Sequence, residues 1–155
     1  AVLRKGALVF TTTIALGGMR FELAIANELH VDAKEARRLK IEIGLDKAAM
    51  RGDVFTSLVP SVSALASEMR RAIEFYQSRM PHKKISSPLS LIILAGGDAN
   101  LIGLDTYLAA MFRIPVIRGD PFARVRRRTS SFIPPLHKNE ALSYATAIGL
   151  ALRER

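Results

Sequence analysis

The chain has 155 residues, of which 49% are hydrophobic and 24% charged, and its formal net charge is +9. This length and apolar content suit one folded domain with a buried core. The absence of cysteine excludes disulfides, thiol nucleophiles and zinc–thiolate sites. No apolar run reaches the roughly 18 residues of a membrane span, and no basic-then-apolar export pattern opens the sequence, so a cytoplasmic protein is expected.

Residues 7–16 are β-branched and apolar, which predicts a strand that ends at Gly17-Gly18. A helix is expected over 19–29, where apolar residues recur at helical spacing and Glu22 points outward. The order strand, Gly-Gly, helix occurs again at Gly96-Gly97. We therefore expect the two glycine turns to line one cleft.

Two further helices follow in the first half of the sequence. One opens at Asp32, with Glu35 three residues later as a capping-box-like pair, and stops before Gly44. After an irregular stretch near 50–59, the longest helix is expected to begin at Pro60. The core-facing stripes predicted for these two helices are Ala36, Leu39 and Ile43, and Val62, Leu65, Met69, Ile73 and Tyr76.

The second half of the sequence predicts strands over 89–94 and 114–117 with a helix over 104–112 between them. A closing helix is expected over 140–152. Its inward residues would be Ala141, Ala145, Ile148 and Leu152. The fold class is therefore α/β, with a mixed sheet flanked by helices.

The turn at Gly96-Gly97 is the strongest candidate for a binding site. It joins a buried strand to a helix, and two glycines let backbone N–H groups approach a phosphate or nucleotide closely. The simpler alternative is that this turn needs glycine for its geometry alone.

Residues for catalysis or metal binding are scarce in the sequence. His30, His82 and His137 are too far apart to suggest a metal site, and each is expected at the surface or at a helix end. Neither paired carboxylates at a strand end nor a nucleophile-elbow serine occurs. We assign no catalytic or metal-binding residue, which favours a nucleotide-binding or scaffold module over a self-contained enzyme.

Much of the positive charge lies between residues 118 and 138. The run Arg126-Arg127-Arg128 precedes Thr129-Ser130-Ser131, a pattern that is typical of a solvated loop. Contact with nucleic acid or an anionic lipid is the alternative. The other basic residues of this stretch are Arg118, Arg124 and Lys138, and they face only Asp120.

One segment stands out at residues 91–125, with the sequence LIILAGGDANLIGLDTYLAAMFRIPVIRGDPFARV. It resembles the adenosine-side motif of the actin-like ATPases, and most closely that of the type IV pilus assembly protein PilM family. Further segments agree with the same family in order, namely FTTTIALGGMRFELAIANEL, EARRLKIEIG, LASEMRRAIEFYQS and the closing ALSYATAIGLALRER. Together these matches cover nearly the whole chain.

The resemblance implies the second lobe of a bilobal, ribonuclease H-like ATPase fold, with residues 1–155 as its C-terminal nucleotide-lobe portion. Residues from about 28 to 75 would form a helical insert subdomain. In the full family, ATP and magnesium sit between the lobes, gripped by two phosphate-binding hairpins. This sequence contains neither hairpin, so hydrolysis by the chain alone is not expected.

The resemblance also assigns five nucleotide-binding positions. The family pattern Ala-Glu-x-x-Lys, which approaches ribose and adenine, corresponds to Ala36 through Lys40, with Arg37 in place of the glutamate. The Gly-Gly-Gly pattern corresponds to Gly96, Gly97 and Asp98. Arginine cannot accept hydrogen bonds from ribose, and Asp98 would repel phosphates. One hypothesis pairs Arg37 with Asp98; the other has Asp98 cap the following helix while Arg37 is solvated.

The function implied by the resemblance is a scaffold of the type IV pilus inner-membrane platform. It would bind ATP, a membrane-anchored PilN-like partner and other platform proteins, and would lie in the cytoplasm, peripheral to the inner membrane. Two alternatives remain open. One is a self-associating filament or division protein like MreB or FtsA, and the other is a basic nucleic-acid or anionic-lipid binding module on a degenerate actin-like fold.

Overall fold

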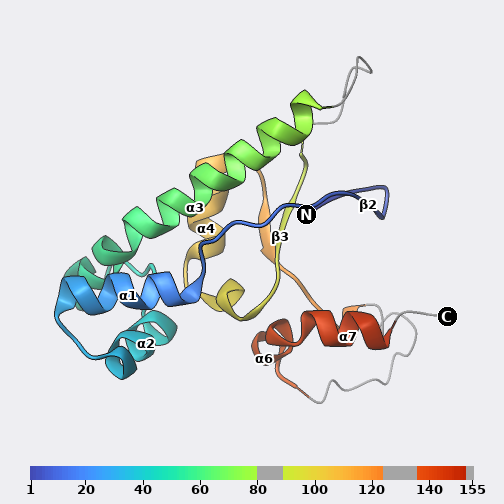
Figure 1. Cartoon of the computed structure of the whole chain (residues 1–155). Coiled ribbons are helices and arrows are strands. Elements are labelled where there is room, and N and C mark those ends of the chain that lie inside the picture. The colour runs from blue at the N-terminus through green and yellow to red at the C-terminus, as the bar shows by residue number, and fades with distance from the viewer. Residues whose placement is uncertain (80–88, 124–135, 153–155) are drawn as a thin grey trace.

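The computed structural model describes residues 1–79, 89–123 and 136–152, and it is a mixed α/β structure in which helices predominate (Figure 1). The elements, in chain order, are β1 (Val2–Arg4), β2 (Ala7–Phe10), α1 (Gly18–Leu29), α2 (Ala33–Glu42), η1 (Ala49–Gly52), α3 (Asp53–Ser78), β3 (Ile92–Leu94), η2 (Gly97–Asn100), α4 (Leu104–Phe112), β4 (Val116–Arg118), α6 (Lys138–Ser143) and α7 (Ala145–Ala151).

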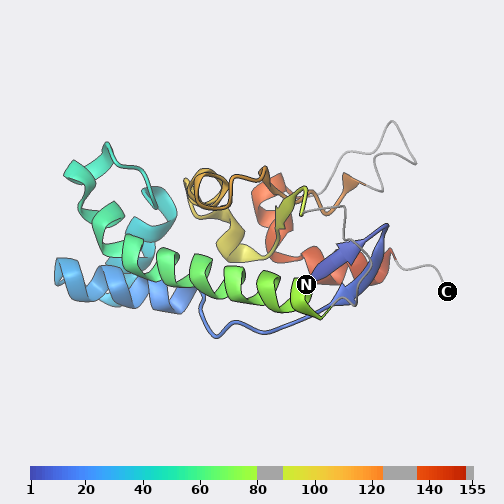
Figure 2. The same cartoon turned by 90° about the horizontal axis from the view of Figure 1, so that it is seen from above.

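The described strands form two small sheets instead of the single mixed sheet expected. β1 and β2 make an antiparallel hairpin, and β3 and β4 pair in parallel with Ile93 opposite Ile117. The hairpin lies at the end of the molecule opposite α1 and α2 (Figure 2). The fold therefore combines a helical end with a sheet-bearing end, and α3 runs along both.

The strand predicted over 7–16 is wrong in its extent. Only Ala7–Phe10 is strand, and it pairs with β1, which was not predicted. Lys5 and Gly6 both have positive φ and make the tight turn between the two strands. Residues 11–16 have a high β propensity, but no strand lies beside them among the described residues. They therefore form no part of a sheet.

The helices over 19–29, 32–43 and 104–112 are confirmed. Asp32 caps α2 by accepting a hydrogen bond from the Glu35 N–H at 2.7 Å. α3 begins at Asp53 instead of Pro60, because Val54 and Leu58 are fully buried and their packing offsets the backbone bond that Pro60 loses inside the helix.

The single closing helix expected over 140–152 is also wrong, because it divides at Tyr144 into α6 and α7. Ala141 and Leu142 of α6 are fully buried. α7 buries no residue fully, so Ala145, Ile148 and Leu152 are only partly covered instead of facing a core.

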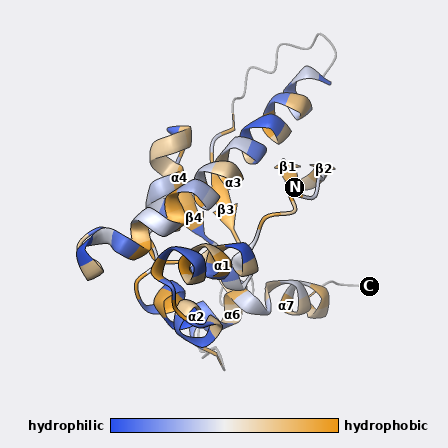
Figure 3. Ribbon diagram, turned by 60° about the vertical axis from the view of Figure 1, so that its left-hand side comes forward, coloured by the Kyte–Doolittle hydropathy of each residue, from blue (hydrophilic) through white to orange (hydrophobic). Residues whose placement is uncertain are grey.

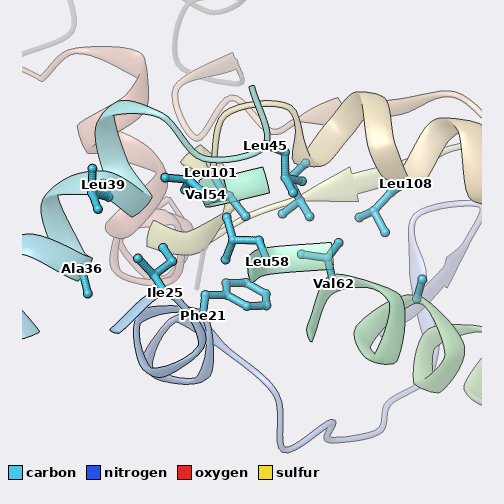
Figure 4. Close-up of a cluster of buried hydrophobic side chains, with 12 residues drawn as sticks. Phe21, Ile25, Ala36, Leu39, Leu45, Val54, Leu58, Val62, Leu101 and Leu108 are labelled. Carbon is cyan, nitrogen blue, oxygen red and sulfur yellow. The ribbon is translucent and has the colours of Figure 1, made fainter. Parts of the chain in front are cut away.

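The main core lies where α1, α2 and α3 meet α4 and the segment before it (Figure 4). Phe21 and Ile25 of α1 pack with Leu58 and Val62 of α3, and all four are at most 1% exposed. The rest of this core consists of Ala36, Leu39, Leu45, Val54, Ala66, Leu101, Leu104 and Leu108. This core joins the two halves of the chain, since three of its leucines come from residues 101–108.

A close backbone contact fixes the end of α2 against the segment before α4. The Leu45 N–H donates to the Ile102 carbonyl at 2.9 Å. Gly44 has φ +56°, and a Cβ atom there would lie 2.8 Å from the same Ile102 oxygen. Only glycine allows this approach, which brings η2 beside α2.

Candidate functional site

Asp98 lies at the centre of the site, where η2 meets the start of α1. Its Oδ2 accepts a hydrogen bond from the Gly18 N–H at 2.8 Å, and its Oδ1 lies 3.2 Å from Lys40 Nζ. Lys40 also reaches Glu22 Oε1 at 2.6 Å, and its side chain is only 13% exposed. One lysine thus holds two carboxylates, from α1 and from η2.

Gly18 is part of the same arrangement because it leaves room for the carboxylate. A Cβ atom at Gly18 would lie 2.7 Å from Asp98 Cγ and closer still to both carboxylate oxygens. At Gly17 a Cβ atom would meet only Oδ2, at 3.8 Å, which is ordinary contact. Glycine is therefore needed at position 18 if Asp98 is to bond the first turn of α1.

A cavity of about 530 Å³ opens beside this contact, between α1, α2, η2 and α6. The lining carries equal numbers of basic and acidic side chains. The basic ones are Arg37, Lys40 and Arg118, and the acidic ones are Glu22, Asp98 and Glu140. The uncharged lining consists of Ile41, Gly97, Asn100, Leu101, Ile102, Asn139 and Ser143. A cavity of this size can hold a small organic ligand.

Four of the five residues assigned to nucleotide binding, Arg37, Lys40, Gly97 and Asp98, line this cavity. They come from α2 and η2, and the direct Lys40–Asp98 contact spans 58 residues of sequence. Gly96 is not part of the lining. It supplies a positive φ of +95° to the turn, and its N–H bonds the Leu142 carbonyl at 3.1 Å.

The pairing of Asp98 with Arg37 is wrong, and so is the role of Asp98 as a cap of the following helix, whereas the expectation that Arg37 is solvated is confirmed. The ion pair of Asp98 is with Lys40, while Arg37 makes no ion pair or hydrogen bond with any part of the chain that the structure describes. The Asp98 side chain also does not cap its own segment; it bonds the N-terminus of α1, 80 residues away. That position satisfies a helix N–H and places negative charge at the positive end of the helix dipole.

The expectation that both glycine turns line one cleft is only half met. The turns touch, through Asp98 and Gly18. Gly17 and Gly18, however, line a separate cavity of about 630 Å³ with Met19, Arg20 and Leu23.

Sequence reasoning missed Glu22, Arg118 and Glu140 as site residues. Glu22 was placed on the outward face of α1, yet it bonds Lys40. Arg118 ends β4 and lies 3.4 Å from Asp105. No local pattern marks these residues, since each joins the site through tertiary packing.

His30 and His137 lie at helix ends, as expected, whereas His82 and Arg124 through Arg128 lie outside the described residues. Within the three described ranges, no three metal-ligating side chains cluster. No helix in those ranges has the length and apolar character needed to cross a bilayer.

Comparison with known proteins places these features in a family. No curated protein matches the sequence. A solved PilM–PilN type IV pilus biogenesis complex contains a similar chain, with a TM-score of 0.64 and 24% identity over 90% of this chain. This chain spans 37% of that one, and the likeness is one of fold. The family model described as type IV pilus assembly protein PilM matches residues 1–155. The chain therefore belongs to the PilM family of type IV pilus assembly proteins.

Proposed function

We propose that this chain serves in type IV pilus assembly, as the nucleotide-lobe part of an actin-like scaffold whose cavity beside Asp98 holds the adenosine end of ATP. One observation carries the proposal: residues assigned from two separate segments converge on one cavity. Family membership over the whole chain supports the pilus role.

The partner in this proposal is PilN-like, since the solved chain of similar fold belongs to a PilM–PilN complex. Through such a partner and other platform proteins, the scaffold would sit in the cytoplasm at the inner membrane.

The cavity suits adenosine better than it suits phosphates. Glu22 and Glu140 can accept hydrogen bonds from ribose hydroxyls, and Asn100 lines the cavity with a buried Oδ1 that has no partner among the described residues. Two of the three lining cations are engaged, because Lys40 holds Glu22 and Asp98, and Arg118 lies 3.4 Å from Asp105. The Gly18 N–H is also taken, by Asp98. Arg37 is the one lining cation without a partner among the described residues, so most contacts to phosphates and magnesium would depend on groups outside this cavity.

Calorimetric titration tests the proposal. The chain and its Asp98→Asn variant would be titrated with adenosine and Mg-ATP at low and physiological salt. We expect adenosine to bind both proteins, and Mg-ATP to bind the variant several-fold more tightly, because one unit charge near a phosphate is worth about 1 kcal/mol or more.

Glu68→Gln is the matched control, since it removes one negative charge on α3, where Glu68 pairs with Arg71 away from the cavity. Loss of adenosine binding in proteins with unchanged circular dichroism would overturn the nucleotide proposal. Binding of Mg-ATP that collapses steeply with added salt would favour the basic-module alternative.

A further inference from the structure

The β1–β2 hairpin projects from one side of the molecule. In Figure 1 its turn points away from the main core, and in Figure 3 both strands stand apart from α1 and α2. Residues 3–9 are all exposed, and we call them the hairpin tip. The base of the hairpin is held at Phe10, whose ring centre lies 5.9 Å from that of Phe75 and 5.7 Å from that of Tyr76. The hairpin tip is therefore an exposed surface on an anchored base.

Two large aliphatic side chains share one face of the hairpin tip. Leu3 and Leu8 are paired across the strands, and residues paired in this way point to the same side of a sheet. They are 66% and 62% exposed. Val9, on the other face, is 40% exposed. Exposed aliphatic side chains that lie together mark a surface that contacts another molecule or a membrane.

The charge of the hairpin tip is entirely positive. Arg4 and Lys5 are exposed, and neither side chain makes an ion pair or a hydrogen bond with any residue that the structure describes. The first acidic residue of the sequence is Glu22, on α1. The hairpin tip therefore favours a contact with negative charge.

The backbone gives no reason for lysine at position 5. Its φ is +50° and that of Gly6 is +81°, as in the tight hairpin turn whose first position favours asparagine, aspartate or glycine. A lysine in this left-handed conformation costs free energy, and strain of this kind is common at functional sites. What lysine adds to the turn is its charge.

We propose that the hairpin tip contacts the surface of a lipid bilayer with anionic headgroups. Arg4 and Lys5 would meet lipid phosphates, while the paired leucines reach the boundary between headgroups and acyl chains. This contact goes beyond the proposed function, in which the chain reaches the membrane through partner proteins.

Other partners fit the hairpin tip less well. A nucleic acid would leave the leucines in water, and the tip has no aromatic side chain to stack on bases. A specific protein interface buries about 800 Å² on each partner, which is more than a projecting turn of this length offers.

Sedimentation with lipid vesicles tests the proposal. The chain would be mixed with vesicles of phosphatidylglycerol and phosphatidylcholine in equal parts, and with vesicles of phosphatidylcholine alone. We expect partitioning onto the anionic vesicles that weakens with added salt, and none onto the neutral ones. Arg4→Gln combined with Lys5→Gln should weaken partitioning at least about tenfold. Lys34→Gln combined with Lys47→Gln, an equal loss of charge at the helical end, should weaken it less than about twofold.

A tryptophan reporter gives an independent measurement, since the chain has no tryptophan of its own. Leu8→Trp places the indole ring on the hairpin tip, and Leu23→Trp places it on α1, at a position that is 56% exposed. The emission of Leu8→Trp should shift to the blue on anionic vesicles, because its ring leaves water. The emission of Leu23→Trp should stay where it is.

Three results would overturn the proposal. One is a folded chain that does not sediment with the anionic vesicles; if it binds a DNA duplex instead, the partner is a nucleic acid. Another is partitioning that the Arg4→Gln and Lys5→Gln pair leaves unchanged, which would assign lipid binding to other basic residues. The third is an emission shift of equal size at both reporter positions. None of these results bears on adenosine binding.

Discussion

The carboxylate of Asp98 meets positive charge on two sides, the N-terminus of α1 and the ammonium of Lys40. Both contacts hold the carboxylate in the wall of the cavity, beside the donors that an anionic ligand would use. An anionic ligand entering the cavity would compete with Asp98 for the same donors. Gly18 is the position at which this contact can be broken without touching a charged group.

Gly18→Ala should destabilise the chain by about 1–3 kcal/mol, because the new Cβ forces Asp98 away from the α1 N-terminus and from Lys40. Urea unfolding measures the change. Gly17→Ala is the matched control, with φ −165° and only ordinary contact at its Cβ. In an Asp98→Gly background, Gly18→Ala should be close to neutral, since alanine favours helix. Equal losses in both backgrounds would contradict the role given to Asp98.

Residue-level prediction put Lys40, Gly97 and Asp98 in one candidate site, and they do line one cavity, but it paired Asp98 with the wrong cation. Arg37 and Lys40 lie three residues apart on α2 and share one side of the helix. Helical spacing alone therefore does not decide which of them pairs with Asp98. Which of them reaches η2 depends on how α2 docks. That docking is set by contacts such as Leu45 with Ile102, which no short pattern reveals.

At the scale of elements, α2 is stabilised on its outer face by a chain of ion pairs. Arg38 donates to Glu35 through Nε at 2.8 Å, and its Nη1 lies 2.6 Å from Glu42 Oε2. These hydrogen bonds from Arg38 hold the pKa of Glu35 below its usual value, and they raise the pKa of Arg38. Glu35 also follows the Asp32 cap, so the first turn of α2 carries most of the local signals that made it predictable.

Arg38→Gln should therefore raise the pKa of Glu35 toward its ordinary value, which an NMR titration of its side-chain carbon measures. The lowered pKa stabilises the folded chain fully above the pKa of Glu35 in the unfolded state. That contribution shrinks as the pH falls toward the folded-state pKa, and it is absent below it. Arg71→Gln, an equal charge change on α3, should leave the Glu35 titration where it is. A Glu35 pKa that is the same in all three proteins would refute this assignment.

Helices and strands were largely predictable as elements, but β1 was missed and the extents of the other strands were not predicted, for a physical reason. α2 is specified by its Asp32 cap, and α1 by the helical spacing of residues such as Phe21 and Ile25. The strands are three or four residues long, and their extent depends on neighbours distant in sequence. α3 was misplaced at its start because Pro60 is an ordinary helix-start signal that burial of Val54 and Leu58 overrides.

At the scale of the whole molecule, stability is distributed unevenly. The core joins α1, α2, α3 and α4, whereas the β1–β2 hairpin contains no fully buried residue. Local opening requires little free energy where few apolar contacts are lost. Apolar packing therefore contributes most of its stabilisation at the helical end of the fold.

Hydrogen exchange of the chain should follow this uneven distribution of stability. The slowest amides are expected around Ile25 and Leu58, and those of β1 and β2 should exchange by local opening, at least about a hundredfold faster. Phe10 contacts the rings of Phe75 and Tyr76, so Phe75→Ala should speed exchange in the hairpin and leave Ile25 unchanged. Uniform protection across the chain would show instead that the hairpin unfolds only with the core.

The contact between Gly18 and Asp98 also orders events during synthesis. A ribosome makes α1, α2 and α3 well before residue 98, so these helices can begin to pack while the N-terminus of α1 still lacks its carboxylate. Glu22 and Lys40 are both made early, and their ion pair can hold α1 against α2 during that interval. Asp98 can then add the second carboxylate to Lys40, so the residue of this contact that is made last would complete the cavity wall.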